Sequence, residues 1–296
     1  MTTFATLKTR LILQTGLSDP LIGQLLVESY KTFQETYPYW SFLRKTTTLT
    51  TVAPYSTGTV ATGASSDTIT GTGTTFTSAM VGRYIKVNND FQFYKIATYT
   101  NPTTIAIETD YADGAKTAQT YSIFKHIFSL ASDFREMISP VFETKLIEAT
   151  IEDIDRYDPG RDTSDRSRYF IYLGLDSSAI QELELYPVPS AAHMYRYRYW
   201  AKPFTFSAGA DINYLPDTLL INDTLATAYL HLAREDIKNT ALYIKLSEQY
   251  RTQAVYLFNE AKHRDVTILG QSKRVRDYES DQRLVGSDWE LSHQIS

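Results

Sequence analysis

The residue types that most often carry acid–base or metal chemistry are spread thinly along this chain. Its five histidines are His126, His193, His231, His263 and His293. None stands in an HxH, HExxH or HxxE pattern, which would place two metal ligands on one face of a helix. The absence of cysteine excludes disulfides, thiolate zinc sites and a cysteine nucleophile. We therefore expect scattered structural histidines, no metal centre and no cofactor.

An acidic series between residues 152 and 165 is the nearest approach to a cation site. It consists of Glu152, Asp153, Asp155, Asp158, Asp162 and Asp165. A calcium loop needs oxygen ligands in a fixed order, but Tyr157 occupies the place of a third ligand and Pro159 precedes the glycine. Because Arg161 and Arg166 alternate with the acids, the sequence favours a loop that neutralises its own charge.

A glycine pair, Gly71-Thr72-Gly73, has the start of a dinucleotide-binding fingerprint. Phe76 stands where the third glycine belongs, and no predicted helix follows whose N-terminus would receive a pyrophosphate. A pair of β-turn glycines is the better interpretation. The sequence also lacks the GxxxxGK[ST] and GxSxG motifs, so we expect a protein that is not an enzyme.

The best nucleic-acid candidate is the alternating segment Tyr195-Arg196-Tyr197-Arg198-Tyr199-Trp200, since aromatic rings stack on bases and arginines neutralise phosphates. On a strand, the arginines share one face and the tyrosines the other. We expect residues 181–186 and 194–200 to form a hairpin that pairs Glu182 and Glu184 with these arginines. That pairing and the net charge of −5 favour a structural hairpin over a nucleic-acid platform.

Helical signals mark both ends of the chain. The first predicted helix spans residues 4–15 and ends at Gly16, and the second begins at Asp19-Pro20 and stops before Pro38. The apolar residues of the second helix recur at helical spacing: Ile22, Leu26, Tyr30, Phe33 and Tyr37. A short capped helix is predicted at 150–157. A final pair of helices is also predicted. The first has Asp217 as its N-cap, and the second spans residues 240–264.

The last predicted helix has an inward stripe of Leu242, Leu246, Tyr250, Leu257 and Ala261. Residues 265–296 have no sustained period and mixed charge, which is typical of an extended tail.

Between Lys45 and Arg83 the only charged residue is Asp67. This Thr-, Ser- and Gly-rich stretch, with the β-branched and aromatic runs after it, predicts a small inserted β module. Expected strands lie near 58–62, 68–71, 84–87, 91–99, 103–107 and 121–124. The predicted fold is α+β, with a discontinuous helical body carrying a β hairpin (1–45 and 126–264), an inserted barrel-like β domain (46–125) and an extended C-terminal tail (265–296).

Several of these segments, taken in chain order, resemble the arrangement of a known protein family. In chain order they are Trp40-Ser41-Phe42-Leu43, the β insert with Gly71–Thr77 and Met80–Arg83, Asp133–Met137, Leu183–Pro189, Tyr199–Pro203 and the final helix pair. Together they resemble the tailed-bacteriophage head-to-tail adaptor, or connector, proteins. The resemblance covers residues 1–264 in element order and carries no catalytic motif.

The resemblance implies a virion structural protein at the head–tail interface, made in the host cytoplasm. Such a protein forms an oligomeric ring, usually dodecameric, that joins the capsid portal to the tail and lines the DNA exit channel. The implied partners are the portal protein, nozzle or tail-tube proteins of the tail, further copies of the chain and, without specificity, genomic DNA. The N-terminus lacks a secretion signal and no run is long enough to cross a bilayer, so no membrane is expected.

The tail supplies the expected portal contacts. These candidates are Trp289, Leu291, Ile295, Arg274 and Arg276, because aromatic and arginine side chains often dominate interfaces. An alternative function is a binding protein whose insert recognises carbohydrate or a host surface through Tyr84, Phe91 and Phe93. The same aromatics would also serve as the core of a small barrel.

Overall fold

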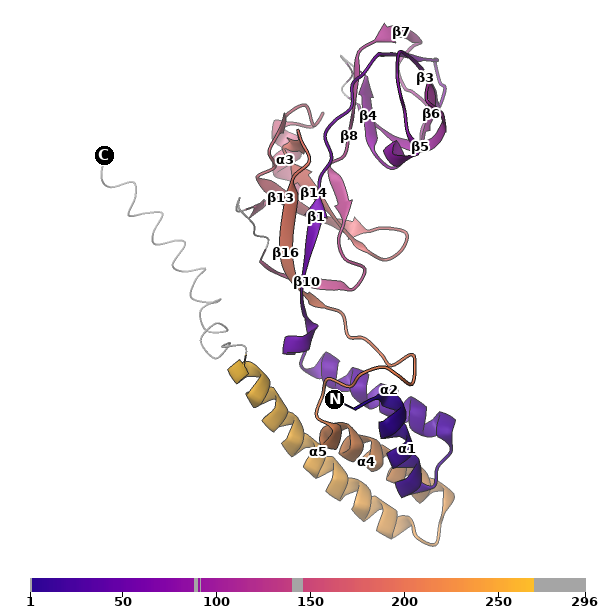
Figure 1. The fold of residues 1–296 in the computed structure, drawn as a ribbon, viewed down its shortest axis with the longest axis vertical. Coiled ribbons are helices and arrows are strands. Elements are labelled where there is room, and N and C mark those ends of the chain that lie inside the picture. Colours follow the sequence, from indigo (N-terminus) through magenta and orange to yellow (C-terminus); the bar gives the residue numbers. More distant parts are fainter. Residues whose placement is uncertain (1, 88–89, 91, 140–145, 269–296) are drawn as a thin grey trace, which may run out of the picture. The chain divides into compact units, whose positions relative to one another are not determined.

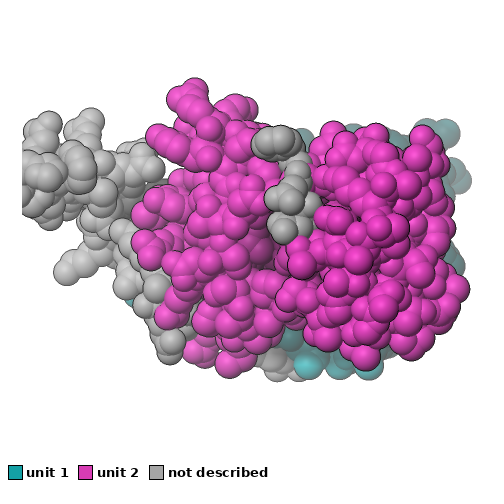
Figure 2. Space-filling model, turned by 90° about the horizontal axis from the view of Figure 1, so that it is seen from above, with its two compact units in different colours: residues 1–45, 200–296 teal, residues 46–199 magenta. Residues whose placement is uncertain are grey.

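The computed structural model describes residues 2–87, 90, 92–139 and 146–268 (Figure 1). The chain forms two compact units, residues 1–45 with 200–296 and residues 46–199, which Figure 2 shows in different colours. We call them the helical unit and the strand unit. The chain passes between them inside strand β1 (Arg44–Thr50) and inside strand β16 (Met194–Ala201). The mixture of helices with separate, largely antiparallel sheets confirms the predicted α+β class.

Four α-helices, drawn from both ends of the chain, make the helical unit. They are α1 (Phe4–Thr15), α2 (Asp19–Thr36), α4 (Asp217–Glu235) and α5 (Thr240–Ile268). Thr3 caps α1 by accepting from the Thr6 amide, and Gly16 ends it in the left-handed region at φ 71°. The bounds predicted for α1 and the start of α2 are confirmed. All five predicted stripe residues of α2 are buried.

Two details of the later helices differ from the prediction. Asp217 does not cap α4, because it is the first helical residue and its carboxylate accepts from Asn213 and Thr2. Leu242 is 54% exposed on α5, so its place in the inward stripe was wrong. The side of α5 that packs is marked instead by Tyr243, whose ring stacks on Tyr229, and by the buried Ser247.

Aromatic rings fill much of the helical unit's core. Tyr30 stacks on Phe206 with ring centroids 4.2 Å apart, and Phe33 stacks on Phe258 of α5 at 5.3 Å. The single-turn helix η1 (Ser41–Leu43) adds Leu43, which is fully buried. These contacts join residues separated by more than 170 positions, so the unit needs both ends of the chain.

The insert folds as one curled seven-stranded antiparallel sheet with the order β7-β2-β3-β6-β5-β4-β8. Its strands are β2 (Thr59–Thr62), β3 (Thr68–Thr72), β4 (Tyr84–Val87), β5 (Tyr94–Asn101), β6 (Thr104–Ile107), β7 (Lys116–Gln119) and β8 (Tyr121–Phe124). The short helix η2 (Ser78–Met80) precedes β4. The two edge strands, β7 and β8, are separated in sequence by Thr120 alone. The outer edge of β8 is bridged by Tyr55, which exchanges two backbone hydrogen bonds with Ile123.

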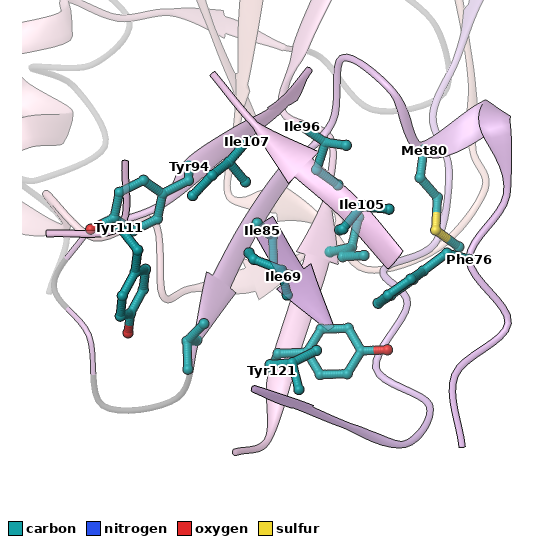
Figure 3. Packing of buried hydrophobic residues seen from close by; sticks show 13 residues of the cluster. Ile69, Phe76, Met80, Ile85, Tyr94, Ile96, Ile105, Ile107, Tyr111 and Tyr121 are labelled. Atoms are coloured by element: carbon teal, nitrogen blue, oxygen red, sulfur yellow. The ribbon is translucent and has the colours of Figure 1, made fainter. Parts of the chain in front are cut away.

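A single apolar cluster fills the inside of this curled sheet (Figure 3). Ile69, Ile85, Ile105 and Ile123 are fully buried there, as alternation on strands with one covered face requires. Phe76 packs edge-on against Tyr121. This packing explains why the Thr- and Gly-rich stretch folds despite its many small polar residues.

The rest of the strand unit consists of smaller sheets. A four-stranded sheet has the order β11-β13-β14-β9, from β9 (Ile127–Ser129), β11 (Ile147–Glu148), β13 (Tyr169–Leu175) and β14 (Gln181–Tyr186). A three-stranded sheet has the order β1-β16-β10, with β10 at Phe134–Ser139. Strands β12 (Ser164–Asp165) and β15 (Val188–Pro189) pair in parallel. Helix α3 (Ile151–Tyr157) is capped by Thr150, as predicted.

The predicted hairpin of residues 181–186 and 194–200 is wrong. Strand β14 lies between β13 and β9, whereas β16 lies between β1 and β10 in another sheet. Strand β14 instead forms a hairpin with the preceding strand β13, and the alternation of β14 fits either neighbour. Residues 126–199 also group with residues 46–125 and not with the helices, so the second boundary lies at Trp200 and not at residue 126.

Candidate interaction surfaces

Lys86 joins the curled sheet to the loop after α3. Its Nζ donates to the carbonyl oxygen of Gly160 at 2.9 Å and forms an ion pair with Asp162. The Lys86 side chain is only 12% exposed, against 71% for Asp162. A largely buried ammonium group needs such partners, so this contact holds residues 46–125 and the 158–165 loop together.

Arg161 anchors the other side of the same loop. Its Nε donates to Glu184 Oε1 at 2.5 Å, its Nη1 to the carbonyl of Asp158 at 2.8 Å, and its Nη2 pairs with Asp155 at 2.7 Å. Burial alone lowers the pKa of Arg161, but hydrogen bonds and charges from Glu184 and Asp155 raise it overall. Both Arg161 and Glu184 are buried. The guanidinium is therefore used up by internal partners and is not available to bind phosphate.

An aromatic cluster surrounds a buried histidine next to this ion pair. The His126 ring lies 4.6 Å from Tyr84, 5.4 Å from Phe93 and 5.3 Å from Phe124. Its Nδ1 is buried without a hydrogen-bond partner in the described residues. Burial, and then the positive charge of Arg161, lowers the pKa of His126 from 6.5 to about 3, so the imidazole is neutral at pH 7.

A pocket of about 570 Å³ opens at this junction. Lys86, Ser122 and Phe124 line it from the curled sheet, and Arg161, Asp162 and Ser164 line it from the loop region. Its cations already have carboxylate partners, and among the described residues no group of three or more His, Asp and Glu side chains is placed to hold a metal. The arrangement is suited to holding two parts of the strand unit together.

A second polar network lies inside the insert. The Asp90 carboxylate accepts from the Tyr111 hydroxyl and pairs with Lys116, which also contacts Asp113 at 2.9 Å. Burial first, and then Asp90, raises the pKa of Tyr111 to about 12. This network ties the end of β4 to the chain that enters β7.

The helical unit presents a different kind of surface, made by exposed apolar side chains on α5. Leu242 is 54% exposed, Ile244 42%, Val255 57% and Tyr256 68%. Ile237, in the turn before α5, is 86% exposed. Scattered apolar residues on a surface are ordinary, but these four lie on a single helix that also packs on α4.

The structure gives mixed outcomes for the predicted site residues. Trp289, Leu291, Ile295, Arg274 and Arg276, proposed for portal contact, lie outside the described residues, as does Phe91. Tyr84 and Phe93 are half-buried against each other and against Phe124 and His126.

Two further expectations need correction. Glu184 does not neutralise Arg198; it is buried and paired with Arg161, while Arg196 and Arg198 are exposed. The predicted tail beginning at residue 265 starts too early, since α5 continues to Ile268 and the Asp265 carboxylate accepts from the Ser41 amide at 2.9 Å. Lys86, His126 and Arg161 were missed as a group because no local pattern connects them.

No model of a known protein family matches the sequence, and comparison with curated proteins gives no significant match. In the described part of the chain, no helix is both long and apolar enough to cross a membrane.

Proposed function

We propose that this chain is a head-to-tail connector of a tailed bacteriophage, a subunit of a ring between the capsid portal and the tail. The observation that carries the proposal is the helical unit. This unit is built from both ends of the chain, in keeping with the order of segments that resembles the connector proteins. It also exposes apolar side chains on its longest helix. In the proposed assembly this unit forms the body of the ring.

The strand unit supports a structural role in a different way. The Lys86, Arg161 and His126 contacts join the insert to residues 126–199, and the pocket between them offers paired charges instead of reactive groups. In the proposed assembly the strand unit is an accessory part displayed by the ring, in contact with tail proteins.

The net charge of −5 fits a channel through which DNA passes, because an acidic wall repels the phosphate backbone and limits sticking. The residues proposed for portal docking remain Trp289, Leu291, Ile295, Arg274 and Arg276.

The test is to mix the purified chain with its cognate portal protein and image the product by electron microscopy. We expect a ring of this protein seated on the portal. The triple variant Trp289→Ser, Leu291→Ser and Ile295→Ser should bind the portal at least tenfold more weakly, whereas the matched control Ser292→Ala should bind normally. A chain that never joins the portal under any condition overturns the connector proposal.

The carbohydrate-binding alternative is less well supported. Sugar stacking needs an open aromatic face, and Tyr84 and Phe93 are half-buried in the His126 cluster. We therefore retain the connector as the proposed function.

A further inference from the structure

Helix α5 has two separate apolar flanks. Successive residues of an α-helix are rotated by about 100° around its axis. Measured from Tyr243, which faces α4, Leu242 and Tyr256 lie about 100° to 140° around the axis to one side. Ile244 and Val255 lie about 100° to 120° to the other side. Tyr243 itself stacks on Tyr229 of α4. The exposed apolar residues thus lie on both sides of the α4–α5 contact and not in one stripe.

We propose that these flanks bind two neighbouring copies of this chain, so that α5 helices of adjacent subunits pack side by side and in parallel. This inference rests on the connector proposal and names the ring contact. A two-fold dimer needs one self-complementary patch, whereas a closed ring needs two different patches that fit each other. One helix with an apolar flank on each side meets the second requirement.

The heights of the residues along the helix fit this pairing. In parallel neighbours related by a ring axis, Leu242 of one copy lies near the level of Ile244 of the next, offset by two residues or about 3 Å. Tyr256 and Val255 differ by one residue, about 1.5 Å. Apolar side chains therefore meet apolar side chains at both ends of the contact.

One pair of charged residues between these apolar pairs is also complementary. On the same projection Lys245 lies on the flank of Leu242 and Tyr256, and Glu248 and Arg251 lie on the flank of Ile244 and Val255, with Glu248 nearer in height to Lys245. Lys245 and Glu248 are both exposed, and neither has an ion-pair partner within the described chain. Parallel packing places Lys245 of one copy beside Glu248 of the next, about one helical turn apart in height, within reach of a long ammonium side chain.

The absence of cysteine allows a direct test by crosslinking. In the full chain carrying Leu242→Cys and Ile244→Cys, the two thiols point to opposite sides of the helix and cannot bridge within one copy. Oxidation of portal-bound rings should give a ladder of covalent multimers. Each single-cysteine variant should stay monomeric. A double variant that stays monomeric in an assembled ring overturns the α5 contact and leaves the connector function standing.

Substitutions give an independent measure of the same contact. Val255→Glu should raise the protein concentration needed for ring formation at least tenfold. Thr252→Glu, at the exposed middle of α5 and about 180° from Tyr243, should leave it unchanged. Lys245→Glu should weaken assembly, and adding Glu248→Lys to the same chain should restore it. If Val255→Glu and Thr252→Glu raise the concentration needed for ring formation equally, while unchanged tryptophan fluorescence shows that both variants are folded, the proposal is contradicted. A chain that stays monomeric with and without portal overturns both proposals.

Discussion

The helical unit carries four exposed apolar side chains on a single helix, whereas the strand unit holds most of the buried charged side chains of the described residues. Val255 and Tyr256 are more than half exposed on α5, while Arg161, Glu184 and Asp90 are each less than a tenth exposed. Exposed apolar surface gains free energy when a partner covers it. Buried charges gain nothing from a partner, but they fix which strands and loops lie together. This difference fits the proposed connector, in which the first unit assembles and the second holds one shape.

The strongest test of this division is to remove the strand unit. Replacing residues 46–199 with a flexible Gly-Ser linker should leave the helical unit folded, because α1, α2, α4 and α5 supply its core. Trp40 and Trp200 are buried in the helical unit, so their fluorescence reports its folding during thermal unfolding. Removing only residues 46–125 should leave 126–199 sensitive to protease, because that deletion removes Lys86 and the aromatic partners of His126. Loss of the tryptophan signal in the first deletion would show that the units are not separable.

Within the strand unit, the largest single-residue effect should come from Arg161→Ala. It leaves Glu184 as a buried, unpaired carboxylate, which costs about 3–5 kcal/mol of unfolding free energy. Denaturant unfolding of the strand unit can be followed by amide hydrogen exchange. The control is Arg168→Ala, whose arginine is 69% exposed and pairs with an exposed aspartate, with an expected loss below about 1 kcal/mol. Similar losses in both variants would contradict the role given to burial.

How far the sequence predicts this fold depends on how local each interaction is. The bounds of α1 follow from Thr3 and Gly16, which act on the backbone within a few residues. The strands of the insert were found because alternation and turns are also local, although β7 was missed. The partner of β14 was chosen wrongly because its alternation fits a hairpin with the strand before it or with the strand after it, and the structure pairs it with the preceding β13. The buried ion pair of Glu184 with Arg161 was not predictable from local patterns, since the two residues are 23 positions apart.

The candidate surfaces were less predictable than the elements. His126 was correctly expected to be structural, but its contacts with Tyr84 and Phe93 depend on how the chain leaves the curled sheet after β8. The exposure of Leu242 was missed because the spacing of apolar residues on α5 fits more than one stripe. The positions of α4, α2 and η1 decide which side of α5 is covered.

The buried histidine predicts a pH effect on the strand unit. In the unfolded chain His126 has a pKa of about 6.5, and folding lowers it to about 3. Between these values the unfolded state binds a proton that the folded state excludes. This contribution to stability is complete above pH 6.5 and is lost as the pH falls toward 3. From pH 6.5 to pH 5 the loss is about 1.6 kcal/mol.

Comparison with His126→Phe isolates this contribution, because phenylalanine fits an aromatic cluster and does not titrate. The variant should lose less stability than the parent between pH 6.5 and pH 5, as measured by hydrogen exchange of β9 and β14. His263→Gln, on the exposed side of α5, is the control and should follow the parent. An identical pH dependence in all three proteins would show that His126 is not neutral and buried.

The smallest expected effect concerns the one buried carboxylate at the end of α5. Asp265 accepts the amide of Ser41 at 2.9 Å and is 8% exposed, so it fixes η1 against the last turns of the helix. Asp265→Ala leaves that amide without its partner and should cost the helical unit about 1–2 kcal/mol, seen as a lower midpoint in tryptophan-monitored denaturation. Glu260→Ala, which removes an exposed i,i+4 pair with Arg264, should cost less than about 0.5 kcal/mol. If Asp265→Ala lowers the free energy of unfolding no more than Glu260→Ala does, the contact between Asp265 and the Ser41 amide does not stabilise the helical unit.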